Sequence, residues 1–408
     1  MAEIKVPFHK AALTKAEEDA VLDVLRSGWL TTGKYALEFE KKFSAAVESK
    51  GLPPVISLAV NSNTSGMILA MEACGVKAGK AVITTPYTFV STATCARHLN
   101  ADVYFADIEK DTYSIDPDKI EEILKKDTSS GVNGNPPHSV CAIVPVHIAG
   151  NICNMKRIME LAAKYSTPEN KIRVIEDAAH AFPSPTSLGC AGTIGDVGVF
   201  SFYVTKTITT AEGGMVCTRD EALARRMTVM RMHGMDRTTW DRYTSPRASW
   251  EYDIIAPGYK FNLPDVLAAI GCCQVDRAQL FYEQRKRIVK KYNKAFSDLD
   301  FIKLPPDGEG NSWHLYLMRI IPEKLTIGRE EFAKKMQEAG LGISVHFIPI
   351  FHFTYWKELY PDFTAANYPN AENQYNATIS IPLFPDMTDE QAELVIETIK
   401  RIGKENHK

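Results

Sequence analysis

Short apolar segments alternate with segments of helical periodicity through the first half of this 408-residue chain. We expect strands at 55–60, 81–85, 102–106, 140–147, 171–177, 197–202 and 215–218. We expect helices at 14–27, 35–49, 67–74, 116–126, 155–165 and 220–232. Strands that alternate with helices predict an α/β fold, in which a mostly parallel sheet is covered by helices on both faces. In such sheets, binding sites lie at the carboxyl ends of the strands.

The length of the chain favours two domains over a single small core. After the apolar helix 265–273 and the charged helix 276–298, the pattern changes to strands at 314–320 and 343–349 and helices at 329–339 and 389–404. We therefore expect a large domain at 1–255 and a smaller C-terminal α/β domain at 256–408.

Composition excludes several classes of function. The net charge is −3 and no polybasic cluster is present, which argues against a nucleic-acid partner or a membrane surface. No apolar stretch approaches the roughly 20 residues that span a bilayer, and the amino terminus lacks the layout of a signal peptide. The eight cysteines show no Cys-x-x-Cys spacing and lie mostly in apolar segments. We therefore expect reduced thiols, a cytoplasmic location and no metal site.

A single lysine, Lys206, lies in a polar turn between the apolar segments 197–202 and 215–218. A lysine beside buried strands is partly desolvated, which lowers its pKa and leaves more of the neutral, nucleophilic amine. Such an amine can form a Schiff base with an aldehyde. Taken alone, the segment fits a lysine in a solvated turn better than a Schiff-base lysine. A second residue is therefore needed to distinguish the two interpretations.

That second residue is Asp177, at the end of the β-branched strand 171–177. A carboxylate at the carboxyl end of a buried strand can keep a pyridinium nitrogen protonated. Enzymes that use pyridoxal 5′-phosphate (PLP) need a lysine for the aldehyde of the cofactor and a carboxylate for its ring. The alternative for Asp177 is a helix N-cap, since Ala-Ala follows it. Together, Asp177 and Lys206 indicate a PLP site.

Two further segments fit this cofactor. The polar residues 61–66 join strand 55–60 to a helix, and free N–H groups at a helix start can bind a phosphate. An ordinary helix cap is the alternative. Phe89 follows strand 81–85 and could lie flat on a planar ring, although a lone aromatic is more often a core residue. A dinucleotide site at 192–198 is rejected, because a strand rather than a helix follows its glycines.

Three motifs carry a resemblance to a known family: Glu-Asp-Ala-Ala-His-Ala at 176–181, Ser-Phe-x-x-x-Lys at 201–206 and Glu-Gly-Gly at 212–214. With them, the chain resembles the DegT/DnrJ sugar aminotransferases from about residue 28 to residue 349. The resemblance implies fold type I of the PLP-dependent transferases, which is the aspartate-aminotransferase fold. It therefore implies a mostly parallel, mixed seven-stranded sheet in the large domain and a homodimer with a shared active site.

The resemblance also implies a role for each candidate residue. Lys206 would carry the cofactor and shuttle the proton, and Asp177 would pair with the pyridine nitrogen. The other residues implied to bind the cofactor are Phe89 on the ring, His180 near the phenolic oxygen, Asn63, Thr64 and Ser201 at the phosphate, and Lys260 and Asn262 from the second subunit. The implied substrate-binding residues are Thr31, Arg231, Arg237 and His346.

His180 and the segment 258–263 resemble the ArnB-like members most, which move an amino group from glutamate to C4 of a UDP-linked 4-keto sugar. The resemblance therefore implies a ping-pong aminotransferase for a nucleotide-linked keto-deoxy sugar, in lipopolysaccharide or polysaccharide biosynthesis. Phe182-Pro-Ser-Pro-Thr replaces the Gly-Ala-x-Tyr of many members, and this leaves C3 open beside C4. The remaining alternatives are a PLP-dependent sugar dehydratase, which Lys206 argues against, and a non-catalytic regulator of the same fold.

Overall fold

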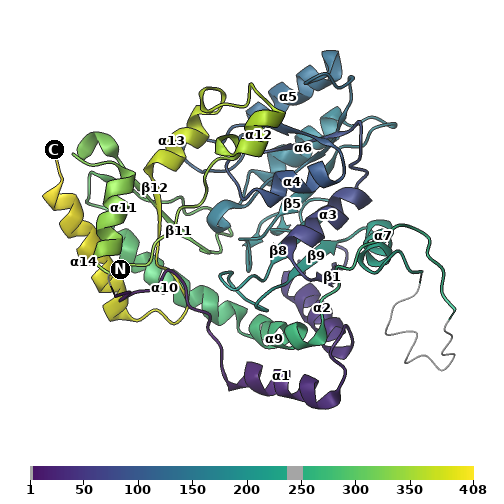
Figure 1. The fold of residues 1–408 in the computed structure, drawn as a ribbon, viewed down its shortest axis with the longest axis horizontal. Coiled ribbons are helices and arrows are strands. Elements are labelled where there is room, and N and C mark those ends of the chain that lie inside the picture. Colours follow the sequence, from purple (N-terminus) through teal and green to yellow (C-terminus); the bar gives the residue numbers. More distant parts are fainter. Residues whose placement is uncertain (1–2, 237–250) are drawn as a thin grey trace.

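The computed structural model describes residues 3–236 and 251–408, and its largest element is a seven-stranded sheet (Figure 1). Its strands, in spatial order, are β1 (Ile56–Val60), β9 (Gly214–Thr218), β8 (Val197–Ser201), β5 (Arg173–Asp177), β4 (Val140–Ile143), β2 (Ala81–Thr84) and β3 (Asp102–Phe105). β9 is antiparallel to both of its neighbours, and the other adjacent pairs are parallel. The predicted α/β class and the mostly parallel, mixed seven-stranded sheet are confirmed.

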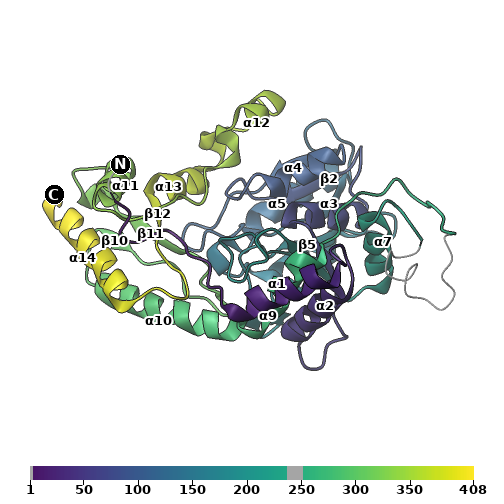
Figure 2. The same ribbon diagram turned by 60° about the horizontal axis from the view of Figure 1, so that its bottom comes forward.

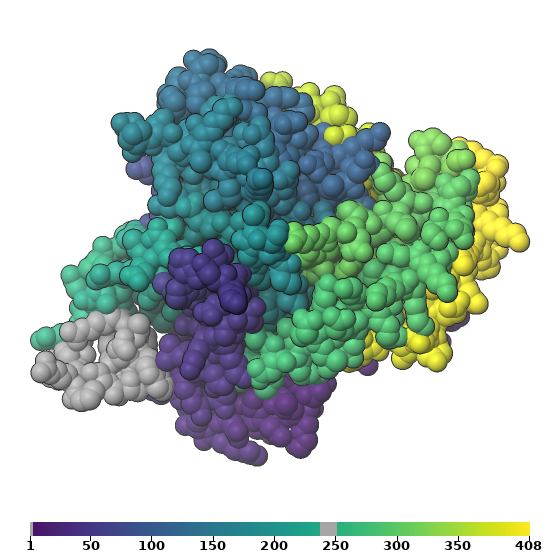
Figure 3. All heavy atoms as spheres, turned by 180° about the vertical axis from the view of Figure 1, so that it is seen from behind, coloured from purple at the N-terminus to yellow at the C-terminus, as the bar shows by residue number. Residues whose placement is uncertain are grey.

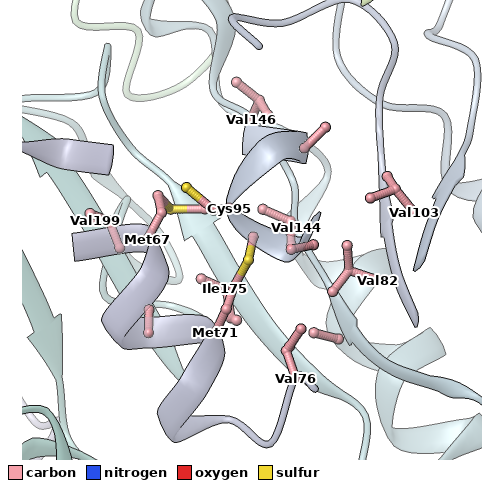
Figure 4. Packing of buried hydrophobic residues seen from close by; sticks show 14 of the residues in the cluster. Met67, Met71, Val76, Val82, Cys95, Val103, Val144, Val146, Ile175 and Val199 are labelled. Carbon is pink, nitrogen blue, oxygen red and sulfur yellow. The ribbon is translucent and has the colours of Figure 1, made fainter. Parts of the chain in front are cut away.

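Helices cover both faces of this sheet, because successive side chains of each strand point to opposite sides. α3 (Asn63–Ala73), α4 (Ser91–His98) and α7 (Glu221–Arg231) lie on one face. α2 (Lys34–Val47), α5 (Pro117–Ser130), α6 (Met155–Tyr165) and α9 (Asp265–Asp276) lie on the other. In β5, for example, Ile175 packs with Met67 and Met71 of α3 (Figure 4), whereas Val174 packs with Ile158 of α6.

α3 approaches the sheet closely. A Cβ atom on Gly66 would lie 2.6 Å from Val199 Cγ1 and 2.9 Å from Val216 Cγ2, so only glycine fits there without a shift of the helix. The helix also begins earlier than predicted, at Asn63, because Ser62 caps it by accepting a hydrogen bond from Ser65 N. The polar residues after β1 are therefore the first turn of α3, and not a separate loop.

The C-terminal region has its own core around a three-stranded antiparallel sheet of β10 (Ile302–Lys303), β11 (Tyr316–Ile320) and β12 (Thr378–Ile381). Its helices are α10 (Ala278–Phe296), α11 (Arg329–Glu338) and α14 (Asp389–Glu405). Val6 pairs with Leu341, so the amino-terminal segment lies against this region and both termini are found there (Figures 1 and 2).

The predicted strand at 343–349 is wrong. In this segment only Ser344 pairs with a strand, through a single bridge to Ser380 of β12. β12 itself was not predicted, because its four residues follow α13 (Pro369–Ala377) directly and carry only two large apolar side chains, Ile379 and Ile381. The helix predicted at 116–126 is also longer than expected, since α5 continues to Ser130.

The two parts of the chain pack against each other in more than one place (Figure 3). α9 contacts α1 (Lys15–Ser27) and α2, and α1 begins at the predicted cap, Thr14, which forms a capping box with Glu17. Phe363, which follows α12 (Thr354–Leu359), stacks on Phe105 of β3 with ring centroids 4.0 Å apart. The domain division at residue 255 stays a prediction. In the described part of the chain, no helix is both long and apolar enough to span a membrane.

Candidate active site

Residues that follow β1, β2, β5 and β8 line a cavity of about 360 Å³. These four strands are parallel to one another, so their carboxyl ends lie at the same edge of the sheet. Glu212 and Gly213, just before β9, complete this wall, and His314, His346 and Phe347 close the cavity from the C-terminal region. The cavity therefore lies where strand topology predicts a site.

Lys206 reaches this cavity from a turn after β8, in which its backbone N–H donates to Tyr203 O at 2.9 Å. Lys206 is half-buried. Desolvation of its amine lowers the pKa of Lys206 to about 8, while the Asp177 carboxylate acts in the opposite direction. Within the described chain, no hydrogen bond or ion pair holds Nζ. A desolvated amine without a partner is a nucleophile ready to react.

This pKa leads to a pH-dependent prediction for the protein without any ligand. A reagent that reacts only with deprotonated lysine should modify Lys206 at a rate that reaches half of its maximum near pH 8, because the amine loses its proton there. Mass spectrometry of the labelled peptides measures the midpoint. Lys164, an exposed lysine whose pKa is raised by a hydrogen bond to Glu121, is the internal control and should react at clearly higher pH. Equal midpoints for the two lysines would contradict the prediction.

Asp177 ends β5 and is buried beside the same cavity. Its Oδ2 accepts a hydrogen bond from Thr92 Oγ1 at 2.7 Å, and its Oδ1 accepts from Ala179 N at 3.2 Å. Burial raises the pKa of Asp177, and the hydrogen bond from Thr92 lowers it. Asn63, predicted at the phosphate, directs its side-chain amide to Val199 O at 3.0 Å and to Asp177 Oδ1 at 3.5 Å instead.

The amino-terminal end of α3 opens onto the cavity. Asn63 and Thr64 are its first two residues, and their N–H groups have no partner within the helix. The hydroxyls of Ser62 and Ser201 line the cavity beside them. Free N–H groups, hydroxyls and the positive end of a helix form a site suited to a phosphate.

The walls around the lysine are aromatic. Phe89 lines the cavity and is 58 % exposed as a residue, so its ring can offer a flat apolar face to a planar ligand. His180 is buried, and burial holds its pKa well below the usual value, so the imidazole is neutral. Its Nδ1 accepts a hydrogen bond from Ala149 N at 3.1 Å. The proton of His180 is therefore on Nε2, which acts as a donor.

The C-terminal region contributes residues that the sequence analysis did not assign to the site. His314 lines the cavity, and its ring centroid lies 4.3 Å from that of His180. Ser312 Oγ donates to His180 O at 2.5 Å, which joins the two parts of the chain. His346, which was predicted, also lines the cavity, and burial lowers its pKa to about 4. Only a strand was visible at 314–320, because the partner of His314 lies 134 residues earlier in the sequence.

Four predicted site residues that the structure describes are not among those that line the cavity, and a further one, Arg237, lies outside the described residues. Arg231 is buried in an ion pair with Glu40 at 2.6 Å and also donates to Ala59 O at 2.8 Å. Thr31 is exposed in the loop between α1 and α2. The other two are Lys260, which contacts Met232 Sδ, and Asn262, which donates to Thr32 Oγ1 at 2.7 Å.

The glycines at 192–198 form a turn around a carboxylate. Glu176 accepts hydrogen bonds from Gly192 N, Ile194 N and Gly195 N at 2.7–2.8 Å. The same side chain contacts His147 Nε2 at 2.9 Å. Because backbone donors of this loop are used by Glu176, the loop supports β5 and does not form a nucleotide site.

Comparisons with known proteins identify the family of this chain. The sequence profile of the DegT/DnrJ/EryC1/StrS aminotransferase family matches residues 11–400. The chain is 37 % identical over 402 residues to the spore coat polysaccharide biosynthesis protein SpsC of Bacillus subtilis, covering 98 % of this chain and 97 % of SpsC.

Solved structures of sugar aminotransferases share the fold. The putative sugar aminotransferase Spr1654 of Streptococcus pneumoniae in its PMP form is 29 % identical, with a TM-score of 0.87 over 98 % of this chain and 100 % of that one. PseC of Helicobacter pylori, an aminotransferase of pseudoaminic acid biosynthesis, is 26 % identical, with a TM-score of 0.85 over 98 % and 99 % of the two chains. Spr1654 is also known in a PLP form. The chain therefore belongs to the DegT/DnrJ/EryC1/StrS aminotransferase family.

Proposed function

We propose that this protein is a PLP-dependent aminotransferase that moves an amino group from glutamate to C4 of a nucleotide-linked keto-deoxy sugar. The observation that carries the proposal is the pairing, in one cavity, of the unpartnered Lys206 amine with the buried Asp177 carboxylate. Membership of an aminotransferase family and likeness to sugar aminotransferases support the same reaction class. C4 rests on the ArnB-like motifs alone.

The described residues fit the cofactor. Lys206 would carry its aldehyde, Asp177 would face its ring nitrogen, and Phe89 would cover one face of the ring. The end of α3 with Thr64, together with Ser201, would hold its phosphate. When bound there, PLP supplies an electron sink for the negative charge that forms when a carbon next to the amino nitrogen loses a proton.

Each residue then has a task that follows from its surroundings. Lys206 Nζ, with a pKa of about 8, can take a proton near neutral pH and return it to another carbon, which is general base and acid catalysis. Asp177, when ionised, would hold a proton on the ring nitrogen of the cofactor. His180 Nε2, which carries the proton of the neutral ring, would donate a hydrogen bond to an oxygen of the bound cofactor.

The site would be completed by a second copy of the chain, as the family resemblance implies. Lys260 and Asn262 do not line the cavity of their own chain, although Asn262 bridges Val60 at the end of β1. From there they would act on the site of the partner. Lys260 would then supply the cation that phosphate binding in the partner needs, since Lys206 is the sole lysine or arginine on the cavity wall among the described residues.

Mixed dimers test this arrangement. As homodimers, Lys206→Ala is expected to be inactive and Lys260→Ala to be weakly active. After exchange of subunits, each mixed dimer contains one subunit of each variant. One of its two sites then has both substitutions, and the other has the native Lys206 of one subunit and the native Lys260 of its partner. Activity should return at this second site. Sedimentation measures the oligomeric state. If mixing restores nothing although dimers exchange, Lys260 acts within its own chain or not at all.

The reaction is tested by incubating the purified protein with glutamate and a panel of nucleotide-linked 3-keto and 4-keto sugars. Mass spectrometry should detect an amino sugar, and NMR of the product should place nitrogen at C4. An amino group at C3 would correct the position only. Loss of a hydroxyl without gain of nitrogen would identify a dehydratase. Release of PLP on denaturation, without any reaction with glutamate, would indicate a non-catalytic protein.

A further inference from the structure

Two buried threonines form a hydrogen-bonded line behind the Asp177 carboxylate. Thr92 Oγ1 is 2.7 Å from Asp177 Oδ2, and Thr88 Oγ1 is 3.0 Å from Thr92 Oγ1. Both threonines are at most 1 % exposed. Thr88 also lines the cavity, just before Phe89, so this line of hydroxyls runs from the cavity wall to the carboxylate.

The direction of these hydrogen bonds follows from the number of protons available. An ionised carboxylate can only accept, so the single hydroxyl proton of Thr92 is donated to Asp177. The oxygen of Thr92 is then left as an acceptor, and Thr88 must be the donor in the contact between the two threonines. Each donation polarises the next, which strengthens the bond that reaches the carboxylate.

Thr92 uses its hydroxyl differently from its helical neighbour. Thr94, also in α4, donates to the carbonyl of Val90, four residues earlier, at 3.1 Å. This local bond is the usual one for a threonine inside a helix. The hydroxyl of Thr92 instead crosses from α4 to β5, to a residue 85 positions away in the sequence. Such a bond stabilises a charge on another element and does little for the helix itself.

We propose that Thr92, supported by Thr88, is a positioning residue that keeps Asp177 ionised and fixes the orientation of its carboxylate toward the cavity. The proposal rests on the proposed function, in which Asp177 faces the ring nitrogen of the cofactor. One carboxylate oxygen is held by Thr92 and the other by Ala179 N at 3.2 Å, so rotation of the group would break both bonds. A carboxylate in a buried position needs such donors to stay charged.

The main test substitutes Thr92 with valine, which keeps the shape of the side chain and removes the donor. The holoenzyme is loaded with cofactor that carries the heavy nitrogen isotope in its ring, and NMR reports whether this nitrogen is protonated. In Thr92→Val, the signal should move toward that of a neutral pyridine. Turnover should fall by roughly tenfold to a hundredfold, as expected for a lost hydrogen bond to a charged group. Thr92→Ser should restore the wild-type signal.

The pH profile gives a second readout with a defined sign. A donor to the ionised form lowers the pKa of a carboxyl group, so its removal raises the pKa of Asp177. The acid limb of turnover should therefore move to higher pH in Thr92→Val. Thr88→Val should change the NMR signal of the ring nitrogen and the acid limb of turnover less, because Thr92 can still donate to Asp177. Thr94→Val, on the same helix, is the matched control and should change neither.

The outcomes separate this proposal from the proposed function. If the wild-type protein binds PLP and shows a protonated ring nitrogen, and Thr92→Val gives the same signal and the same acid limb, the positioning role is wrong while the enzyme assignment stands. Equal shifts in Thr94→Val would show a general disturbance of α4 and would also overturn the role of Thr92. If the wild-type protein binds no PLP, the proposed function itself fails.

Discussion

Replacement of Lys206 with alanine is expected to abolish amino transfer, with a loss of roughly 10⁴-fold or more in turnover. Lys206 has two tasks that no other described residue on the cavity wall can take over, because it is the sole amine there. In the proposed function it would hold the cofactor covalently and move the proton. The purified variant should also lack the absorbance of a lysine-linked cofactor, and glutamate assays by mass spectrometry measure the remaining turnover.

A measurement of the stability of the apoprotein tests whether the loss of turnover in Lys206→Ala is caused by unfolding. The depressed pKa means that the unfolded chain binds more protons than the folded one between about pH 8 and 10.5. A charged Lys206 therefore destabilises the apoprotein below about pH 8, by on the order of 3 kcal/mol, and this cost disappears as the pH rises to 10.5. Apo Lys206→Ala should be at least as stable as the wild type at neutral pH. Lys164→Ala is the surface control, and unchanged activity in Lys206→Ala would refute the assignment.

The part of the site that could be predicted from the sequence is the part built from strand ends. Lys206, Asp177, Phe89, Thr64 and Ser201 each follow or end a recognisable apolar segment. In a parallel sheet the carboxyl ends of the strands converge, so a local pattern is sufficient to bring such residues together. The same alternation predicted a mostly parallel sheet covered by helices on both faces, and the family resemblance implied its seven strands.

The part that could not be predicted depends on contacts between distant segments. Nothing near Thr92 in the sequence indicates that its hydroxyl meets Asp177, and it looks like a residue of a helix start. Arg231 looks like a free cation for an anionic substrate, yet Glu40, 191 positions away, holds it in an ion pair. His314 lies at the start of a predicted strand, and only the packing of the C-terminal region brings it to His180.

Asn63 shows how a prediction can place a residue correctly while its side chain does something else. It lines the cavity at the start of α3, where its backbone N–H fits a phosphate. Its side-chain amide, however, is directed to Val199 O and toward Asp177. In the proposed function, the N–H of Asn63 would therefore serve the phosphate, while its side chain contacts β8 and approaches Asp177.

Substitution of Asp177 with asparagine is expected to leave cofactor binding largely intact and to lower turnover by roughly 10³-fold. Asparagine keeps the shape and can still accept the hydrogen bond from Thr92, but it has no negative charge with which to hold a proton on the ring nitrogen. Without that proton, the ring no longer withdraws electrons effectively. The loss corresponds to about 4 kcal/mol of transition-state stabilisation, a size typical for the removal of one electrostatic partner.

Asp177→Asn should lower the stability of the apoprotein little, although it lowers turnover strongly. This contrast would distinguish a catalytic role of Asp177 from a structural one. Burial raises the pKa of Asp177, so the ionised side chain carries a desolvation cost that asparagine does not. Asp127→Asn is the matched control, because Asp127 is also buried and accepts bonds from Ser139 N, Ser139 Oγ and Val140 N away from the cavity wall. Denaturant unfolding of the apoproteins should show a larger loss of stability for Asp127→Asn than for Asp177→Asn. Turnover per folded protein should show the opposite order, and a similar loss of turnover in both variants would mean that the charge of Asp177 has no special part in the reaction.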